Sequence, residues 1–164
     1  MLLAGTASAT LVPRISFEAL TDASELIVSG HVTRSWTEWD SEHKYIWTHY
    51  ELAATSAYKG VAATGSLVEF AEPGGALDGK VMMIEGAVNY GPGDQVVVFL
   101  SRMPNRYLRT TGWAQGKYEV DTAGRLHGSA ALGDALRSLE GMNVTELRQR
   151  IAARLRPAGS GRLQ

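Results

Sequence analysis

The sequence contains no cysteine, which excludes a disulfide framework, thiolate metal sites and a cysteine nucleophile. It also lacks any apolar run near the roughly 20 residues that a membrane-spanning helix needs, so we expect no membrane span. Neither sign of charge dominates. The formal net charge is −1, which gives no electrostatic footprint for nucleic acid, so no nucleic-acid partner is expected.

Motifs for catalysis and cofactor binding are missing as well. The sequence has no G-x-S-x-G, H-E-x-x-H, G-x-G-x-x-G or Walker motif. We therefore predict no catalytic residue, no cofactor and no enzyme activity. What is present is a globular composition, with 45% hydrophobic and 20% charged residues in 164 residues. A chain of this length can build a core without a metal or a disulfide.

The first nine residues are apolar and small, and they end in Ala7-Ser8-Ala9. This ending has the A-x-A pattern that signal peptidase cleaves. We interpret residues 1–9 as the remnant of a signal peptide and expect the protein to work outside the cytoplasm, either in the periplasm or as a secreted protein.

The middle of the sequence predicts a series of strands separated by glycine-rich turns. The predicted strands are 26–36, 45–58, 66–70, 80–85 and 95–100, followed by one or two last strands at 107–111 and 116–120. The short polar turn at 40–43 predicts that the first two strands form an antiparallel hairpin. The run QVVVFL at 95–100 is the most apolar and predicts a central strand buried on both faces.

Helical spacing flanks these strands. Residues 14–26 predict a short helix with Ser16 as its N-cap, and Asn143 with Glu146 predicts a capping-box start for a C-terminal helix. The fold class is therefore mainly β with flanking helices: an OB-like Greek-key β-barrel of five to six strands plus a C-terminal α-helix. A β-sandwich is the alternative. The sequence predicts four consecutive parts: a signal-peptide remnant (1–9), an OB-like β-barrel domain with a short N-terminal helix (10–124), a helical C-terminal extension (125–157) and a flexible tail (158–164).

The ordered segments ELIVSGHV, AYKG, PGG, GPGDQVVVFL and GWAQGKYEV resemble a family of uncharacterised bacterial exported proteins. Their strand order is similar to that of netrin-like and metalloproteinase-inhibitor-like OB barrels. The resemblance covers residues 25–120 and implies mainly a fold, because most matching positions are glycines. Inhibitor-like members depend on cysteines, including an N-terminal one that chelates the protease zinc. This chain has none, so the resemblance does not imply inhibition by that mechanism.

The histidines do not predict a metal site. They are His31, His43, His49 and His127. With a hairpin turn near 41–42, His49 is expected opposite Arg34 and His31 opposite Leu52, which separates the imidazoles. A zinc site needs three or four ligands in direct contact with the ion.

Aromatic side chains near the tip of the first hairpin are the candidate ligand-binding residues: Trp36, Trp39, Tyr45 and Trp47. The same turn predicts Trp36 and Trp47 as cross-strand partners, and such pairs stabilise a sheet by themselves. The alternative interpretation is a binding surface, because OB barrels bind ligands around their first strands.

Together these features predict a monomeric, non-enzymatic extracytoplasmic binding or interaction module. The expected partner is an envelope protein, a peptide or a glycan. The alternatives are a protease inhibitor that acts through a loop and a hydrolase-type enzyme.

Overall fold

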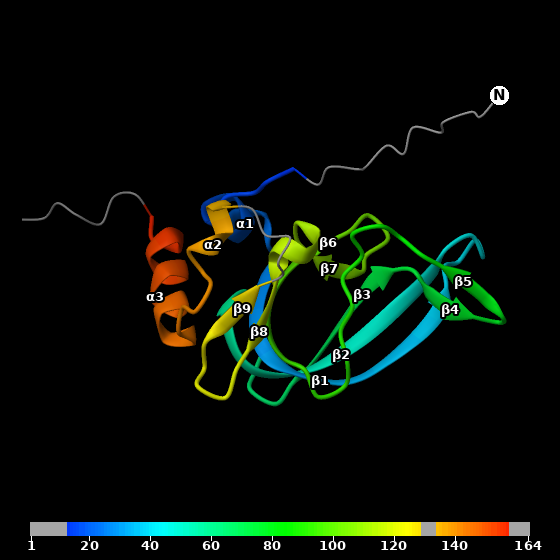
Figure 1. Cartoon of the computed structure of the whole chain (residues 1–164), viewed down its shortest axis with the longest axis horizontal. Coiled ribbons are helices and arrows are strands. Elements are labelled where there is room, and N and C mark those ends of the chain that lie inside the picture. Colours follow the sequence, from blue (N-terminus) through cyan, green and yellow to red (C-terminus); the bar gives the residue numbers. More distant parts are fainter. Residues whose placement is uncertain (1–12, 129–133, 158–164) are drawn as a thin grey trace, which may run out of the picture.

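The computed structural model describes residues 13–128 and 134–157, so the predicted signal-peptide remnant and the predicted tail lie outside the described residues. The helices are α1 (Phe17–Ala23), α2 (Asp134–Arg137), α3 (Val144–Leu155) and a short 3₁₀ helix, η1 (Trp113–Gly116). The strands are β1 (Leu26–Trp39), β2 (Ile46–Lys59), β3 (Leu67–Pro73), β4 (Gly75–Leu77), β5 (Lys80–Met82), β6 (Gln95–Arg102), β7 (Leu108–Thr110), β8 (Lys117–Val120) and β9 (Leu126–Gly128). The prediction of a mainly β protein is confirmed (Figure 1).

Antiparallel pairing joins the described strands into one curled sheet in the order β3-β2-β1-β6-β8-β9. Strand β7 pairs with the end of β6 beyond β8, and β4 pairs with β5 as a separate hairpin. The two 14-residue strands β1 and β2 form the predicted hairpin. Among the described residues, β3 pairs only with β2, so the hydrogen-bonded sheet is open between β3 and β7.

Two hydrophobic cores lie on opposite faces of this sheet. The inner core, inside the curl, includes Val28, Tyr50, Leu52, Phe70 and Val98. Because successive strand residues face opposite ways, the neighbours of these residues on β1 and β6 point to the other face. The apolar run of β6 is therefore buried on both faces, as predicted.

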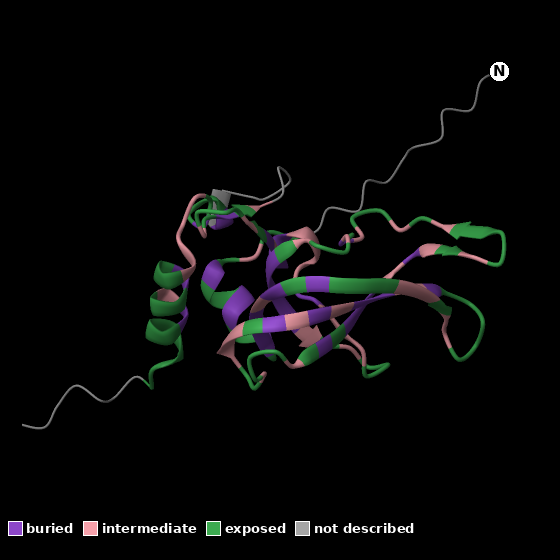
Figure 2. Cartoon of the chain, turned by 90° about the horizontal axis from the view of Figure 1, so that it is seen from below, coloured by how far each residue is buried: buried purple, intermediate pink, exposed green. Residues whose placement is uncertain are grey.

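The outer core lies between the sheet and the helices. Ile27, Val97 and Phe99 from the sheet meet Phe17 of α1 and Leu147 of α3. Figure 2 shows buried residues both where helices meet the sheet and along the long strands, whereas β4 and β5 contain no buried residue. Residues 125–157, predicted as a helical extension, supply β9 to the sheet and pack α2 and α3 against it.

The local signals for the helices are seen in the structure. Ser16 caps α1 by accepting a hydrogen bond from the Ala19 amide at 3.1 Å. Asn143 and Glu146 form the predicted capping box of α3. Within the described ranges, no helix has both the length and the hydropathy to cross a bilayer.

Candidate functional site

The β1–β2 hairpin carries the four predicted ligand-binding residues, and its register decides which of them lie together. Trp36 pairs with His49 and Glu38 pairs with Trp47, so the predicted Trp36–Trp47 cross-strand pair is wrong. The reason is the position of the turn: the Asp40 amide donates a hydrogen bond to the Tyr45 carbonyl and Trp39 pairs with Ile46, so the hairpin turns at 42–43 and not near 41–42. A β-bulge just before Arg34 then decides which face each side chain takes relative to the inner core. A one-residue slip moves every later side chain to the opposite face. The bulge turns Trp36 away from the inner core and onto the outer face of the sheet.

Five side chains form a contiguous outer aromatic strip: Arg34, Trp36, His49, Tyr107 and Trp47. The Trp36 and His49 rings stack with centroids 5.3 Å apart, and Arg34 Cζ lies 4.4 Å from the Trp36 ring. Tyr107, from the loop before β7, meets His49 and Trp47 edge-on at 5.0 and 5.4 Å. Trp36, Trp47 and Tyr107 are half-buried, so the strip is packed yet reaches solvent.

The other two predicted residues do not join the strip. Trp39 pairs with Ile46, whose side chain is fully buried, and so points to the opposite face. The Trp39 indole donates a hydrogen bond to Asp78 at 2.9 Å, and Lys80 lies 5.2 Å from its ring. Trp39 therefore holds the β4–β5 hairpin. Tyr45 lies next to the hairpin turn and is 52% exposed.

His49 is the most enclosed member of the strip, with 3% of its side chain exposed. Its Nδ1 lies 3.1 Å from Glu69 Oε1, and its Nε2 has no hydrogen-bond partner within the described structure. The nearest carboxylate to Nε2 is Glu38, at 3.9 Å. Arg34 pairs with Glu51 rather than with His49, which corrects the predicted register at this position.

A buried polar network closes the gap between β3 and β7. Glu72 is 1% exposed and accepts hydrogen bonds from the Thr110 amide at 2.8 Å and from Arg109 Nε at 3.1 Å. The Thr110 hydroxyl lies 2.6 Å from the Tyr90 hydroxyl. Burial raises the pKa of Glu72, and the hydrogen bonds from Thr110 and Arg109 oppose that rise. A side chain thus joins two strands that no backbone ladder joins in the described sheet.

Arg109 also reaches a pocket of about 420 Å³, which we call the Arg109 pocket. Its lining includes Ile15, Ser101, Met103, Arg109, Gly112 and Trp113. Arg109 Cζ lies 3.6 Å from the centre of the Trp113 ring. Arg109 Nη2 is buried without a hydrogen-bond partner among the described residues. An unmet donor on a charged group costs about 1–3 kcal/mol, so this position requires an explanation.

Backbone strain is found at the same pocket. Gly112 and Trp113 have consecutive positive φ angles of 66° and 59°. Glycine adopts this region freely, but a bulky side chain such as tryptophan does so at a cost of about 1–3 kcal/mol. Strain of this kind persists only where the surrounding contacts impose it, and here it holds the indole beneath Arg109.

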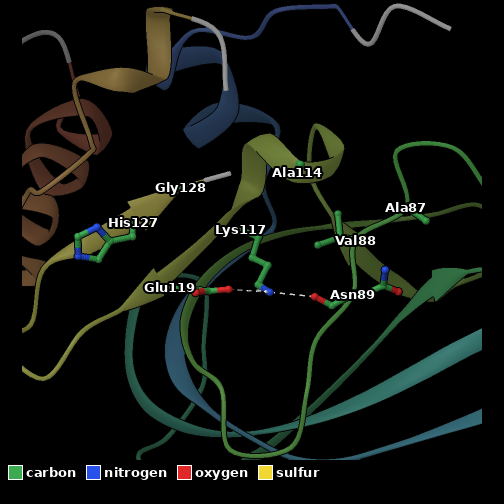
Figure 3. A pocket seen from close by; sticks show the side chains of 8 residues that line it. All are labelled: Ala87, Val88, Asn89, Ala114, Lys117, Glu119, His127 and Gly128. Carbon is green, nitrogen blue, oxygen red and sulfur yellow. Dashed lines mark hydrogen bonds and ion pairs between the residues drawn. The ribbon is translucent and has the colours of Figure 1, made fainter. Parts of the chain in front are cut away.

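A second pocket, of about 320 Å³, lies between the loop before β6 and strand β8 (Figure 3). Lys117 donates a hydrogen bond to the Asn89 carbonyl at 2.9 Å and lies 3.4 Å from Glu119 Oε1. It also lies 4.7 Å from the Tyr90 ring. The contacts with Asn89 and Tyr90 join β8 to the loop, whereas Glu119 lies on β8 itself. The ammonium group is already satisfied by the protein, in contrast to the guanidinium of Arg109.

His127, on β9, bridges two carboxylates. Its Nδ1 lies 2.9 Å from Glu140 and its Nε2 lies 3.1 Å from Asp121. The hydrogen bond to Asp121, followed by that to Glu140, raises the pKa of His127. In Figure 3 its ring points away from Lys117. Within residues 13–128 and 134–157, no three histidine or acidic side chains are placed to hold a metal ion.

Sequence reasoning identified the hairpin but missed the residues that organise it. Tyr107 and Glu72 belong to no motif in the sequence, and no neighbouring residue indicates that Arg109 is part of a site. Trp113 in its glycine-rich segment was the one available signal, because glycine before a bulky aromatic indicates an unusual backbone. Its ring packs partly against the inner core and partly beneath Arg109.

Comparisons with protein-family models, with curated proteins and with solved structures find no match to this chain.

Proposed function

We propose that this protein is a non-enzymatic interaction module that works outside the cytoplasm and binds an envelope protein through the outer aromatic strip. The observation that carries this proposal is the position of the strip. It lies on the face of the β1–β2 hairpin opposite the inner core, with three half-buried aromatic side chains reaching solvent. Aromatic side chains next to arginine are enriched at protein interfaces. The A-x-A ending at Ala9 supports the location.

The geometry favours a protein over a glycan as the partner. A sugar binds tryptophan by stacking on an open ring face, but His49 stacks on Trp36 and Arg34 lies over its ring. These contacts leave less of the Trp36 ring face for a sugar, and half-buried aromatic side chains beside an arginine suit a packed protein interface. The two imidazoles with strong hydrogen bonds, His49 and His127, bond to carboxylates and not to a hydroxyl nucleophile in the described structure. This supports a binding role over a hydrolase.

The proposed fold is an OB-like barrel that is not closed by backbone pairing. Strands β1, β2 and β3 form a meander, β1 also pairs with β6, and Glu72 joins β3 to β7 at the remaining gap. In this proposal the netrin-like strand order supplies a scaffold, and the long hairpin presents the strip beyond it.

The test compares two tryptophans that share one hairpin but face opposite ways. Tagged protein is used to isolate envelope partners, the partner is purified, and its affinity is measured for the unmodified chain, Trp36→Ala and Trp39→Ala. We expect Trp36→Ala to weaken binding roughly tenfold or more, as an interface anchor does. Trp39→Ala should keep the affinity, because Trp39 contacts the β4–β5 hairpin instead.

Unfolding of each variant is followed in parallel by urea titration. If Trp36→Ala binds as well as the unmodified chain, the strip is not the interface. If it unfolds several kcal/mol more easily, the strip is a packing device and the proposal fails.

A further inference from the structure

The guanidinium of Arg109 is held in place by two contacts, but not all of its hydrogen-bond donors have an acceptor. Glu72 accepts a hydrogen bond from Nε, and the Trp113 ring lies 3.6 Å from Cζ. Nη2 is buried and makes no hydrogen bond within the described structure. A guanidinium carries five N–H donors in a rigid fork that matches a carboxylate. The fork is therefore fixed in orientation, and its Nη2 lacks an acceptor.

Hydrogen bonds and backbone conformation hold the walls of the Arg109 pocket in place. Gln115, which is 7% exposed, accepts a hydrogen bond from the Ile15 amide and donates one to the Pro13 carbonyl, both at 3.0 Å. These two bonds fasten the segment before α1 to η1 and make that segment one side of the pocket. The strained backbone at Trp113 fixes the other side.

The lining combines apolar surface with positive charge. Pro13, Ile15, Met103 and Trp113 provide apolar contacts, and Arg109 provides the positive charge. No acidic side chain is among the described residues that line this pocket. Its volume of about 420 Å³ falls within the range of small-molecule sites. This combination suits a ligand with one anionic group and an apolar body.

We propose that the Arg109 pocket binds an organic carboxylate with an apolar body. The carboxylate pairs with the guanidinium of Arg109, which lines the pocket, and the apolar part packs on Met103 and Trp113. Glu72 acts as a positioning residue, because its hydrogen bond to Nε fixes the orientation of the guanidinium. This site is separate from the outer aromatic strip, so the two proposals stand or fall independently.

The experiment is an NMR titration of the full chain that follows the Trp113 indole N–H and the Arg109 Nε–H. The probes are phenylacetate and phenylacetamide, which have the same apolar body with and without the negative charge. A second pair, a short peptide ending in phenylalanine with a free or an amidated carboxyl group, separates free acids from peptide C-termini as the source of the carboxylate. We expect saturable shifts with at least one free carboxylate and none with its amide.

Three variants test the geometry. Arg109→Lys keeps the charge next to Glu72 but removes the fork, and it should weaken binding roughly tenfold or more. Gln115→Leu should weaken binding by releasing the Ile15 wall without touching Arg109. Arg154→Lys is the matched control, because Arg154 also pairs with a carboxylate, Asp22, but lies on α3 away from the pocket. Its affinity should not change.

The proposal is overturned if neither free carboxylate gives a saturable shift, or if an amide binds as well as its acid. It is also overturned if Arg109→Lys, shown by its spectrum to be folded, binds as the unmodified chain does. Should Arg109→Lys fail to fold, the comparison of acid with amide on the unmodified chain decides. Trp36→Ala should leave the carboxylate affinity unchanged.

Discussion

Removing Glu72 should destabilise this protein more than removing any exposed carboxylate, because Glu72 is the acceptor that joins β3 to β7. Glu72→Ala leaves the Thr110 amide without its acceptor and leaves the Arg109 charge unpaired in a buried position. Breaking one partner of a buried ion pair costs about 3–5 kcal/mol. We expect a loss of that size in the free energy of unfolding.

Glu72→Gln separates charge from hydrogen bonding. The amide oxygen still accepts from Thr110, but the ion pair with Arg109 is lost, so we expect an intermediate loss of about 1–3 kcal/mol. Combining Glu72→Gln with Arg109→Met removes both charges and should recover part of that loss, because the uncompensated guanidinium is gone.

Burial raises the pKa of Glu72, so the folded protein binds a proton there more tightly than the unfolded chain does. Its contribution to stability therefore falls as the pH rises from the unfolded pKa, near 4.5, through the raised folded pKa. Glu72→Gln cannot titrate. The difference between the unmodified chain and this variant isolates the effect from carboxylates with lowered pKa values, such as Asp22, Glu25 and Glu51, which act in the opposite direction.

The measurement is urea denaturation followed by circular dichroism, with Glu42→Ala as the control. Glu42 lies in the hairpin turn, 70% of its side chain is exposed, and its partner Lys44 is exposed as well. Its loss should cost less than about 1 kcal/mol. If Glu72→Ala unfolds within about 1 kcal/mol of the unmodified chain, or if Glu42→Ala costs as much as Glu72→Ala, the buried network does not close the sheet.

Two further predictions concern the sheet. Asp121 and Glu140 raise the pKa of His127, so its stabilising contribution is full below its ordinary value of 6.5 and is lost as the pH rises through the raised folded pKa. Urea midpoints measured on both sides of 6.5 should fall with pH in the unmodified chain and fall less in His127→Gln; equal slopes would contradict this. A Cβ on Gly30 would lie 2.3 Å from a β2 carbonyl oxygen, so Gly30→Ala should cost about 2 kcal/mol or more. The control Gly91→Ala makes only ordinary contacts, and similar melting temperatures for both variants would refute the argument.

The interaction proposal and the carboxylate proposal place two surfaces on one small sheet. The outer aromatic strip lies on the long hairpin, where Tyr107 covers it from the β6–β7 loop. Arg109 follows Tyr107 by two residues and enters the other site. The short segment from Tyr107 to Trp113 therefore contributes to both surfaces, which makes it the part of the chain where sequence changes should matter most for function.

Local signals in the sequence were sufficient for most elements. The apolar run 95–100 predicted a strand buried on both faces, and β6 is that strand. Ser16, Asn143 and Glu146 predicted helix starts because caps act within one turn of the chain. Strand β9 was missed: its three residues are too few for a periodic pattern, and it is held by pairing with β8.

Only the tertiary structure decided which side chains meet. The bulge before Arg34 moved Trp36 to the outer face and Trp39 to the inner one, and a two-residue periodicity cannot reveal such a slip. Glu72 and Arg109 lie 37 residues apart and meet because the sheet curls. The absence of cysteine thus determined at the outset what chemistry this chain lacks. Its candidate sites depend on register and curvature, which arise from contacts distant in sequence.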